Sequence, residues 1–391
     1  MKRFQTRILP FFLSILMLLP LSGCTSGKKS VYKDTVFLGM DTYITLRLPQ
    51  GDITDTRMEE IAAGCRDIVA DLEGKLSCHD PASEVSALNS NVQLLFDADE
   101  TFLSVWQTAV QIANLTDGAY DPTLGALTEL WNVNGGGPVP PSAAVAEALR
   151  HTGIANIHVD GTTVSKDDPQ LQLDLGGIAK GYALQSVLSY LSGTEAPYGI
   201  VSMGGNIGVY GTKPDATAYK IGIKDPQNTT AVLGYLSIQN GFVSVSGSYE
   251  RYFVENGKTY HHILDPKTGY PAESGLRSVV VWTQNGAAAD TLSTALFVMG
   301  LDAGISFYDS GKASFEAIFV TDENEIYLTD GLKASGLFAL RADGYRMADC
   351  CGTNIVVRKA RRTERRYVVS EERIHSCRTE NSFHRNPCAN R

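Results

Sequence analysis

The sequence predicts an α+β protein with a mainly antiparallel sheet, packed helices and a smaller helical part. Two observations lead to this prediction. From residue 154 onward, short strand-like runs separated by turns follow one another, whereas a parallel sheet would require regular alternation of strand and helix. Before residue 150, helical periodicity dominates. We therefore divide the body into a helical part, about 50–150, and a sheet part, about 151–349.

Composition excludes several classes of protein. Of the 391 residues, 43% are hydrophobic and 20% charged, which is globular composition and excludes a long disordered chain. The single long apolar run, about 8–21, is shorter than the ~20 residues of a membrane-spanning helix, so a multi-pass membrane protein is excluded. Residues 24–349 carry a net charge of −18, against +3 for 1–23 and +6 for 350–391. Nucleic acid is therefore not an expected partner, because phosphate contacts need clustered Lys and Arg.

The N-terminus has the pattern of a targeting segment. Basic residues and an apolar run precede Ser22, Gly23 and Cys24, so 1–23 is predicted to be a signal peptide. Small residues directly before a cysteine resemble a bacterial lipobox, in which Cys24 is lipidated and becomes the new N-terminus. The alternative is an ordinary signal peptide that contains a cysteine. The lipobox predicts an extracytoplasmic protein, anchored to the cell membrane by lipid, with 24–35 as a polar tether.

The C-terminal segment, 350–391, differs from the rest of the chain. It is rich in arginine, holds four of the seven cysteines and has little apolar periodicity, so we expect an appended, disordered tail. No CxxC pair occurs in the sequence, which argues against a structural zinc site.

The elements of the body follow from periodicity and turn residues. A first strand is expected near 31–39, and apolar residues at three- and four-residue steps predict a helix over 54–76. Further helices are expected over 99–115, from about Ser142 to Arg150, over 176–191 and over 287–299. Strands are expected in the following runs: 157–165 with a DG turn, 171–175, 200–211, 219–226, 234–247, 250–264, 276–282, 315–321 and 325–330.

The run DLGGIAKG combines features that suit an anionic ligand. Asp174 is expected to end a strand, Gly176 and Gly177 permit close backbone approach, and the start of a helix offers free amides near Lys180. The alternative is a tight turn with a surface lysine. In AAADTLSTALFVMG, Asp290 and Thr294 lie four residues apart on one helix face and offer hard oxygen ligands to Mg²⁺. The alternative is a helix cap and a packing contact.

The run YHHILDPKTGYP carries two of the seven histidines. On a strand, His261 and His262 would point to opposite faces, so at most one enters any given site. A histidine there suits a general base, or else it is simply packed or solvated. Serine hydrolase chemistry finds no support, because the sequence has no GxSxG motif.

Five motifs, taken in their order along the chain, resemble the ApbE family of FAD:protein FMN transferases, over about 36–349. They are DLGGIAKGYA, VSMGGNI, SGSYERYF, HHILDPKTGYP and AAADTLSTALFVMG. The resemblance implies a fold related to tunnelling-fold proteins. It also implies a Mg²⁺ ion held by Asp290, Thr294 and the carbonyl of Gly177, with His262 needed for transfer. FAD would be bound by the remaining matched residues: Met40, His79, Ala119, Tyr120, Asp121, Asp174, Lys180 and Leu264.

Two departures from the family pattern concern the flavin. Asp41 stands where glycine is usual, and His79 stands where a tyrosine is common, so flavin stacking could differ here. The family's reaction is Mg²⁺-dependent transfer of FMN from FAD to a threonine or serine of an acceptor protein, through a phosphoester bond and with release of AMP. The implied acceptors are flavoprotein subunits of redox complexes. Two alternatives stay open: an FAD diphosphatase that gives FMN and AMP, and a flavin-binding lipoprotein without catalysis.

Overall fold

The computed structural model describes residues 32–51, 53–90, 95–349, 356–357 and 369–370. The predicted signal peptide, the lipidation site Cys24, most of the tether and most of the tail lie outside these residues. In the tail, the structure describes only a short antiparallel strand pair, β18 (Val356–Val357) with β19 (Val369–Ser370).

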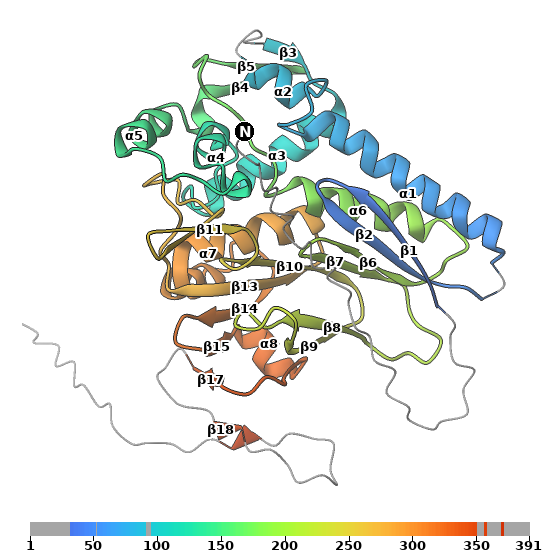
Figure 1. The fold of residues 1–391 in the computed structure, drawn as a ribbon. Coiled ribbons are helices and arrows are strands. Elements are labelled where there is room, and N and C mark those ends of the chain that lie inside the picture. The colour runs from blue at the N-terminus through green and yellow to red at the C-terminus, as the bar shows by residue number, and fades with distance from the viewer. Residues whose placement is uncertain (1–31, 52, 91–94, 350–355, 358–368, 371–391) are drawn as a thin grey trace, which may run out of the picture.

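A nine-stranded sheet forms the centre of the fold (Figure 1). Its strands pair antiparallel, except for the parallel pair β15–β17 at one edge. The prediction of an α+β fold with a mainly antiparallel sheet is therefore confirmed. In spatial order the strands are β1 (Tyr32–Gly39), β2 (Thr42–Pro49), β6 (Gly199–Met203), β7 (Asn206–Tyr210), β10 (Gly241–Gly247), β13 (Leu276–Thr283), β14 (Glu316–Thr321), β15 (Glu325–Leu328) and β17 (Arg346–Ala348).

Each face of this sheet packs against a different layer. Successive residues of a strand point to opposite faces, and on β13 Val279 and Val281 join the cluster that includes helix residues, whereas Val280 joins the second cluster. The helices of the first layer are α1 (Asp55–Leu76), α6 (Ala179–Ser192) and α7 (Gly286–Asp309). The second layer is a three-stranded sheet of β8 (Tyr219–Lys224), β9 (Val232–Ile238) and β16 (Phe338–Leu340), with α8 (Asp330–Ser335) beside it.

The helices expected before residue 150 are present. They are α1, α3 (Glu100–Leu115) and α5 (Ser142–Arg150). The structure adds two helices that the sequence did not predict, α2 (Glu84–Asn89) and α4 (Gly125–Trp131), and the short 3-10 turn Val133–Gly135 follows α4. Strand β3 (Leu95–Asp97) pairs with β5 (Thr163–Lys166), which pairs with β4 (Ile157–Asp160) after the 3-10 turn Ile154–Asn156. Because the β3–β5 pair and the contact between α1 and α6 cross residue 150, the helical and sheet parts share one hydrophobic core.

The expected strand at 171–175 is wrong. Leu171, Leu173 and Leu175 alternate inward and are fully buried, so the segment is extended, but it forms only an isolated bridge from Gln172. The side chain of Asn89 occupies the place of a neighbouring strand: its Oδ1 accepts from the Leu173 N–H at 2.7 Å, and its Nδ2 donates to the Leu173 carbonyl at 2.7 Å. Asp174 therefore ends an extended segment rather than a strand.

Helix α7 continues beyond the predicted end at residue 299. The backbone leaves helical geometry at Gly300 (φ 78°), and a second helical stretch then runs to Asp309. This helix is long and apolar enough to cross a bilayer by composition, yet it packs against α6, β10 and β13. It is therefore a core helix.

Candidate active site

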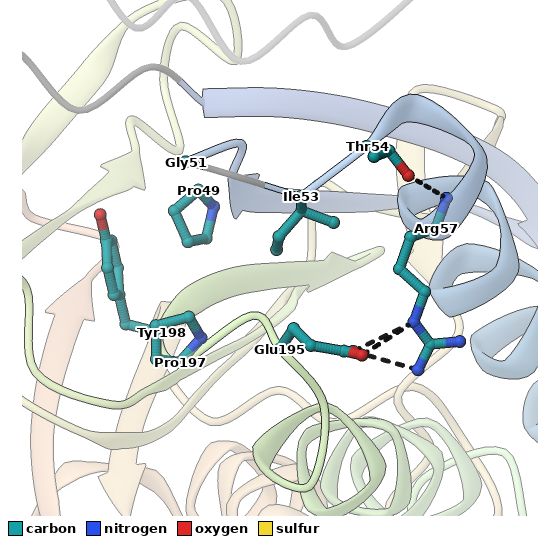
Figure 2. Close-up of a pocket in the computed structure, with 8 residues that line it drawn as sticks. All are labelled: Pro49, Gly51, Ile53, Thr54, Arg57, Glu195, Pro197 and Tyr198. Atoms are coloured by element: carbon teal, nitrogen blue, oxygen red, sulfur yellow. Dashed lines mark hydrogen bonds and ion pairs between the residues drawn. The ribbon is translucent and has the colours of Figure 1, made fainter.

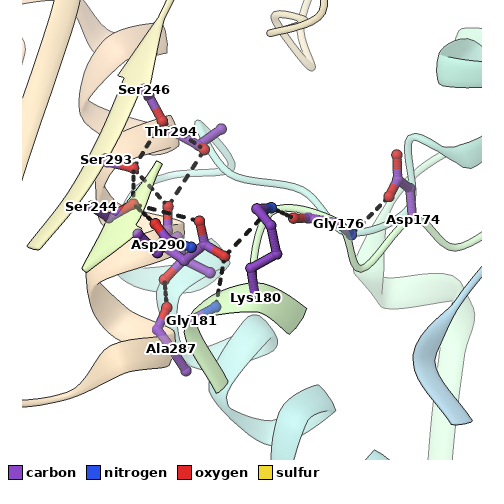
Figure 3. A network of polar contacts seen from close by, with 12 residues as sticks. Asp174, Gly176, Lys180, Gly181, Ser244, Ser246, Ala287, Asp290, Ser293 and Thr294 are labelled. Atoms are coloured by element: carbon purple, nitrogen blue, oxygen red, sulfur yellow. Dashed lines mark hydrogen bonds and ion pairs between the residues drawn. The ribbon is translucent and has the colours of Figure 1, made fainter. Parts of the chain in front are cut away.

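The site begins where α6 and α7 cross. A Cβ atom added to Gly181 would lie 2.1 Å from the carbonyl oxygen of Gly286, and one added to Gly286 would lie 2.4 Å from the carbonyl oxygen of Gly181. Neither contact leaves room for a side chain, so the two helix backbones touch here. This contact brings the start of α6 next to Asp290 in the second turn of α7 (Figure 3).

The carboxylate of Asp290 accepts a hydrogen bond at the N-terminus of α6. It is 6% exposed, its Oδ2 accepts from the backbone N–H of Gly181 at 2.9 Å, and the same oxygen lies 3.8 Å from Nζ of Lys180. A carboxylate at a helix N-terminus meets unpaired amides and the positive end of the helix dipole. Asn285, not Asp290, caps α7, since its side chain accepts from the N–H of Ala288. The interpretation of Asp290 as the cap of its own helix is therefore wrong.

A network of buried hydroxyl groups lies behind Asp290. The Ser293 hydroxyl is at its centre, 2.8 Å from Oγ of Ser246, 3.1 Å from Oγ of Ser244 and 2.9 Å from the Asp290 carbonyl, to which it donates. Oγ of Ser246 lies 3.2 Å from Oγ1 of Thr294. Ser244 also donates to Oδ1 of Asn206, whose Nδ2 is buried without a partner. The network links β7, β10 and α7 and fixes the helix face that carries Asp290 and Thr294.

The DLGG loop faces the same cluster. Asp174 accepts from the Gly176 N–H at 2.8 Å, and Lys180 donates to the Gly176 carbonyl at 2.5 Å (Figure 3). A Cβ atom on Gly177 would lie 4.0 Å from Oγ1 of Thr294 and 3.1 Å from Cε2 of Tyr120. Gly177, Lys180, Asp290 and Thr294 are thus brought together.

The loop at 119–121 lies against this cluster. The backbone N–H of Asp174 donates to the carbonyl of Pro122 at 2.8 Å, which ties the two loops together. Burial raises the pKa of the Tyr120 hydroxyl well above its usual value, and the charges of Asp174, Asp290 and Asp121 raise it further. Burial also raises the pKa of Asp121, although Thr123 donates two hydrogen bonds to it. The Tyr120 hydroxyl has no partner, and Ala119 beside it is buried.

Met40 and Asp41 form the two-residue turn between β1 and β2. Both have positive φ, 50° and 56°, which is the geometry of a type I′ turn and explains why glycine suits the second position. The side chain of Met40 packs on the main core. The exposed residue His79 follows Cys78, whose pKa is raised to about 12, mainly by burial and then by the charges of Asp174 and Asp41. Because the charges of Asp174 and Asp41 act on Cys78, the loop that carries Cys78 and His79 lies near both carboxylates.

The two neighbouring histidines have different surroundings. His261 ends β12 (Lys258–His261), is buried, donates from Nε2 to the Ala272 carbonyl and accepts at Nδ1 from the Ile263 N–H, so both ring nitrogens are used. Nδ1 of His262 lies 3.2 Å from the carbonyl oxygen of Arg251. Because a carbonyl only accepts, Nδ1 carries the proton and Nε2 keeps its lone pair.

Surrounding protein atoms lower the pKa of His262, and the nearby charges of Arg251 and Lys180 lower it further. The imidazole is therefore neutral at pH 7. Because the charge of Lys180 acts on the His262 ring, His262 lies near the polar cluster that contains Lys180.

Leu264 lies in a separate apolar cluster. It is buried with Leu127, Trp131, Val145 and Phe253, between the hairpin of β11 (Tyr252–Glu255) and β12 on one side and α4 and α5 on the other. Its side chain is therefore committed to packing.

The residues around Asp290 fit a magnesium ion. Mg²⁺ prefers oxygen ligands and is commonly held by one or two carboxylates together with waters and substrate phosphates. Asp290 and Thr294 offer such oxygens, and Oδ1 of Asp290 has only one long contact, 3.5 Å to Ser244. Within the described part of the chain, no group of three or more His, Cys, Asp or Glu residues has the arrangement of a metal site. The ion would therefore depend on substrate phosphates for further ligands.

A cavity of about 610 Å³ lies elsewhere, beside the connection between β2 and α1 (Figure 2). Its one arginine, Arg57, is paired with Glu195 at 3.0 Å, so the two charges neutralise each other. None of the predicted site residues lines it. The chemistry therefore belongs to the α6–α7 cluster rather than to this cavity.

Comparison with known proteins agrees with this geometry. The model of the ApbE family matches residues 40–319, which include both loops, both helices and the hairpin described above. The chain belongs to the ApbE family. A protein from Haemophilus influenzae named FAD:protein FMN transferase is 32% identical over 333 residues, which cover 81% of this chain and 94% of the relative. One of the same name from Vibrio cholerae is 29% identical over 80% of this chain and 94% of the relative.

Solved ApbE structures share the fold. The ApbE protein of Thermotoga maritima superimposes with a TM-score of 0.71 at 34% identity, covering 78% of this chain and 99% of that structure. The flavin transferase ApbE of Vibrio cholerae gives a TM-score of 0.67 at 26% identity, with the same coverage.

Sequence reasoning missed the groups that support the site. It named Gly176 and Gly177 as close-approach glycines, whereas the two backbones that meet at the site do so at Gly181 and Gly286. Small residues at both helix starts were the available signal. It also missed Ser293, because nothing in the sequence pairs a serine on α7 with two on β10.

Proposed function

We propose that this protein transfers the FMN part of FAD to a threonine or serine hydroxyl of an acceptor protein, in a Mg²⁺-dependent reaction that forms a phosphoester bond and releases AMP. Family membership supports flavin transfer by an enzyme. The observation that carries the finer proposal is the convergence of Asp290, Thr294, Lys180 and the start of α6 in one place. Such a group suits the pyrophosphate of FAD in an otherwise acidic protein.

Each group has a distinct role in this proposal. Asp290, Thr294 and the carbonyl of Gly177 would hold Mg²⁺, which when bound neutralises charge on the pyrophosphate and on the departing phosphate. Lys180 would contact the FAD phosphates, since its ammonium lies 3.8 Å from Asp290 and beside the amides of α6. The hydroxyl network around Ser293 keeps the ligand face in position.

His262 is the proposed general base. With Nδ1 donating to the Arg251 carbonyl and the ring neutral, Nε2 is free to accept the proton of the acceptor hydroxyl. The hydroxyl oxygen then forms a bond to the FMN phosphorus, and the bond from that phosphorus to the AMP oxygen breaks. His261 is unsuited to this role because both of its nitrogens are already used.

The remaining predicted residues would bind the dinucleotide. Asp174 would contact FAD next to Lys180. The other residues assigned to the flavin or adenine pocket are Met40, His79, Ala119, Tyr120, Asp121 and Leu264. Of these, Leu264 would act through the shape of its apolar cluster, since its side chain is buried there.

The cellular setting is part of the proposal. Signal peptide 1–23 and lipidation at Cys24 would place the enzyme outside the cytoplasm, anchored to the cell membrane. Its acceptors would be flavoprotein subunits of redox complexes. The support for this setting is the N-terminal sequence pattern.

The test uses the full chain in detergent with FAD, Mg²⁺ and the flavin-free soluble domain of a redox-complex subunit that carries an acceptor threonine. AMP release and acceptor mass are both followed. We expect a mass gain of one FMN that is lost with EDTA, with Asp290→Asn, and with the acceptor threonine replaced by alanine. AMP with only free FMN would instead indicate a diphosphatase, and intact FAD would indicate a binding protein.

A further inference from the structure

Exposed large apolar side chains gather on two hairpins. Single exposed apolar residues are normal on protein surfaces, but clusters indicate interaction sites. Among the described residues, seven large apolar side chains are exposed, and five of them lie on β1–β2 or on β11. These five, here called the hairpin surface, are Val36, Leu38, Tyr43, Tyr252 and Val254. The other two, Leu95 and Val159, lie on the small sheet of β3, β5 and β4.

The β1–β2 hairpin presents one bare face. Leu38 pairs with Tyr43 across the strands, so the two side chains share a face, and they are 69% and 51% exposed. The opposite face of β1 meets α1, where a Cβ atom on Gly39 would lie 2.6 Å from the side chain of Val69. None of the described helices or strands therefore covers the face of Leu38 and Tyr43.

The outer edge of β1 is also free. This strand is the first in the order of the nine-stranded sheet, so none of the described strands pairs with its outer side. An edge strand offers unpaired N–H and C=O groups along its length, and an apolar edge without protecting features binds other chains readily. The charges near its start, Lys33 and Asp34, are paired with Asp55 and Arg47. The end of the strand that carries Leu38 has no charged residue.

Both parts of the hairpin surface adjoin predicted site residues. Met40 follows β1 directly, and His262 follows β12, the partner of β11. On β11, Phe253 is buried against Trp131 and its neighbours, so Tyr252 and Val254 point away from that cluster. Figure 1 shows the two hairpins apart, with α6, β7 and β10 drawn between them. These three elements carry part of the polar cluster, and α7 carries the rest, including Asp290.

We propose that the hairpin surface is the docking site of the acceptor protein, which adds an extended segment to the free edge of β1 and contacts β11 on the other side of the site. This inference rests on the proposed transfer function and specifies how its protein substrate is held. An added strand gains main-chain hydrogen bonds from the edge and side-chain contacts from its face. An acceptor held on both sides would present its hydroxyl between Met40 and His262.

Charge favours a protein over a lipid surface as the occupant. Anionic membranes attract clusters of Lys and Arg, whereas the basic residues nearest to Leu38 and Tyr43 on this hairpin are neutralised in ion pairs. The acidic body of the chain also opposes such binding.

The experiment compares three double variants of the full chain in detergent, with the same flavin-free acceptor domain. Leu38→Ser with Tyr43→Ser, and Tyr252→Ser with Val254→Ser, remove the two halves of the surface. Leu95→Ser with Val159→Ser is the matched control, because it removes two other exposed apolar groups elsewhere on the surface. All six side chains are exposed, so thermal unfolding is expected to match the parent chain.

We expect each hairpin variant to raise the KM for the acceptor by about tenfold or more, as loss of an interface anchor does, with FAD affinity and kcat at saturating acceptor unchanged. The control should stay at the parent value. A KM within about twofold of the parent in both hairpin variants would overturn the inference while leaving FMN transfer established. If the hairpin variants differed from the parent chain in sedimentation without a change in KM, the inference would be overturned in favour of self-association. If they lost binding to vesicles without a change in KM, it would be overturned in favour of a lipid surface. If the parent chain transfers no FMN, the proposed function fails first and this inference fails with it.

Discussion

The contact between α6 and α7 gives the sharpest prediction. In Gly181→Ala, the new Cβ would lie 2.1 Å from the Gly286 carbonyl oxygen and 2.7 Å from Cβ of Asp290, whereas ordinary contacts begin near 3.4 Å. The helices must therefore separate by about 1 Å, against backbone on both sides, because close-packed interiors yield little. Overpacking usually costs about 1 to 3 kcal/mol, and a backbone neighbour that cannot rotate away places this variant near 3 kcal/mol.

This cost converts into a measurable shift of the melting temperature. The described body has about 310 residues, and an unfolding entropy of about 2.1 cal/mol/K per residue gives a fall in Tm of about 5 °C. Gly74→Ala is the matched control, because Gly74 lies in α1 with no atom within 4 Å of its added Cβ. There alanine should stabilise the helix by about 0.5 to 1 kcal/mol.

Differential scanning calorimetry of both variants, at equal protein concentration, measures the two shifts. They should have opposite signs. A Gly181→Ala protein that melts at or above the parent temperature would refute the backbone contact, and with it the placement of Asp290 against the start of α6.

Four further predictions concern three residues. Because the pKa of His262 is lowered, its ring stays neutral as pH falls, so the initial rate of FMN transfer should be level from about pH 8 to about pH 5.5; a loss with a midpoint near 6.5 would contradict the assignment. The same lowered pKa means that, below about pH 6.5, the unfolded chain binds a proton at this ring that the folded chain does not. The ring's contribution to the free energy of unfolding, measured in urea titrations, should therefore decrease as the pH is lowered through about 6.5. Asp41→Gly should raise the free energy of unfolding by about 0.5 to 1 kcal/mol in urea, since Asp41 has φ 56° and glycine adopts this conformation without strain; no gain would argue against the turn. Ser293→Ala should lower the same free energy by about 1 to 3 kcal/mol, because it leaves buried hydroxyl groups unpaired, and an unchanged urea midpoint would show that the network is not formed.

Local sequence patterns predicted most elements correctly. The helix expected over 54–76 is α1, and the turn-separated runs after residue 154 are mostly strands of the observed sheets. The exception at 171–175 has a physical cause, because a strand requires a partner and here the amide of Asn89 satisfies the Leu173 backbone instead. No pattern within five residues can show that a side chain 84 positions away will take that place.

The sequence by itself determined which groups can do the chemistry. Four-residue spacing puts Asp290 and Thr294 on one helix face, and two glycines before Lys180 make a loop that a ligand can approach, because helix and turn geometry are local. Tertiary structure alone decided which of these groups meet. It joined Asp290 to Gly181 across 109 positions, used both nitrogens of His261 while leaving Nε2 of His262 open, and left the edge of β1 free. These outcomes depend on how helices and strands distant in the chain pack together, and that packing is set by the whole hydrophobic core rather than by any short segment.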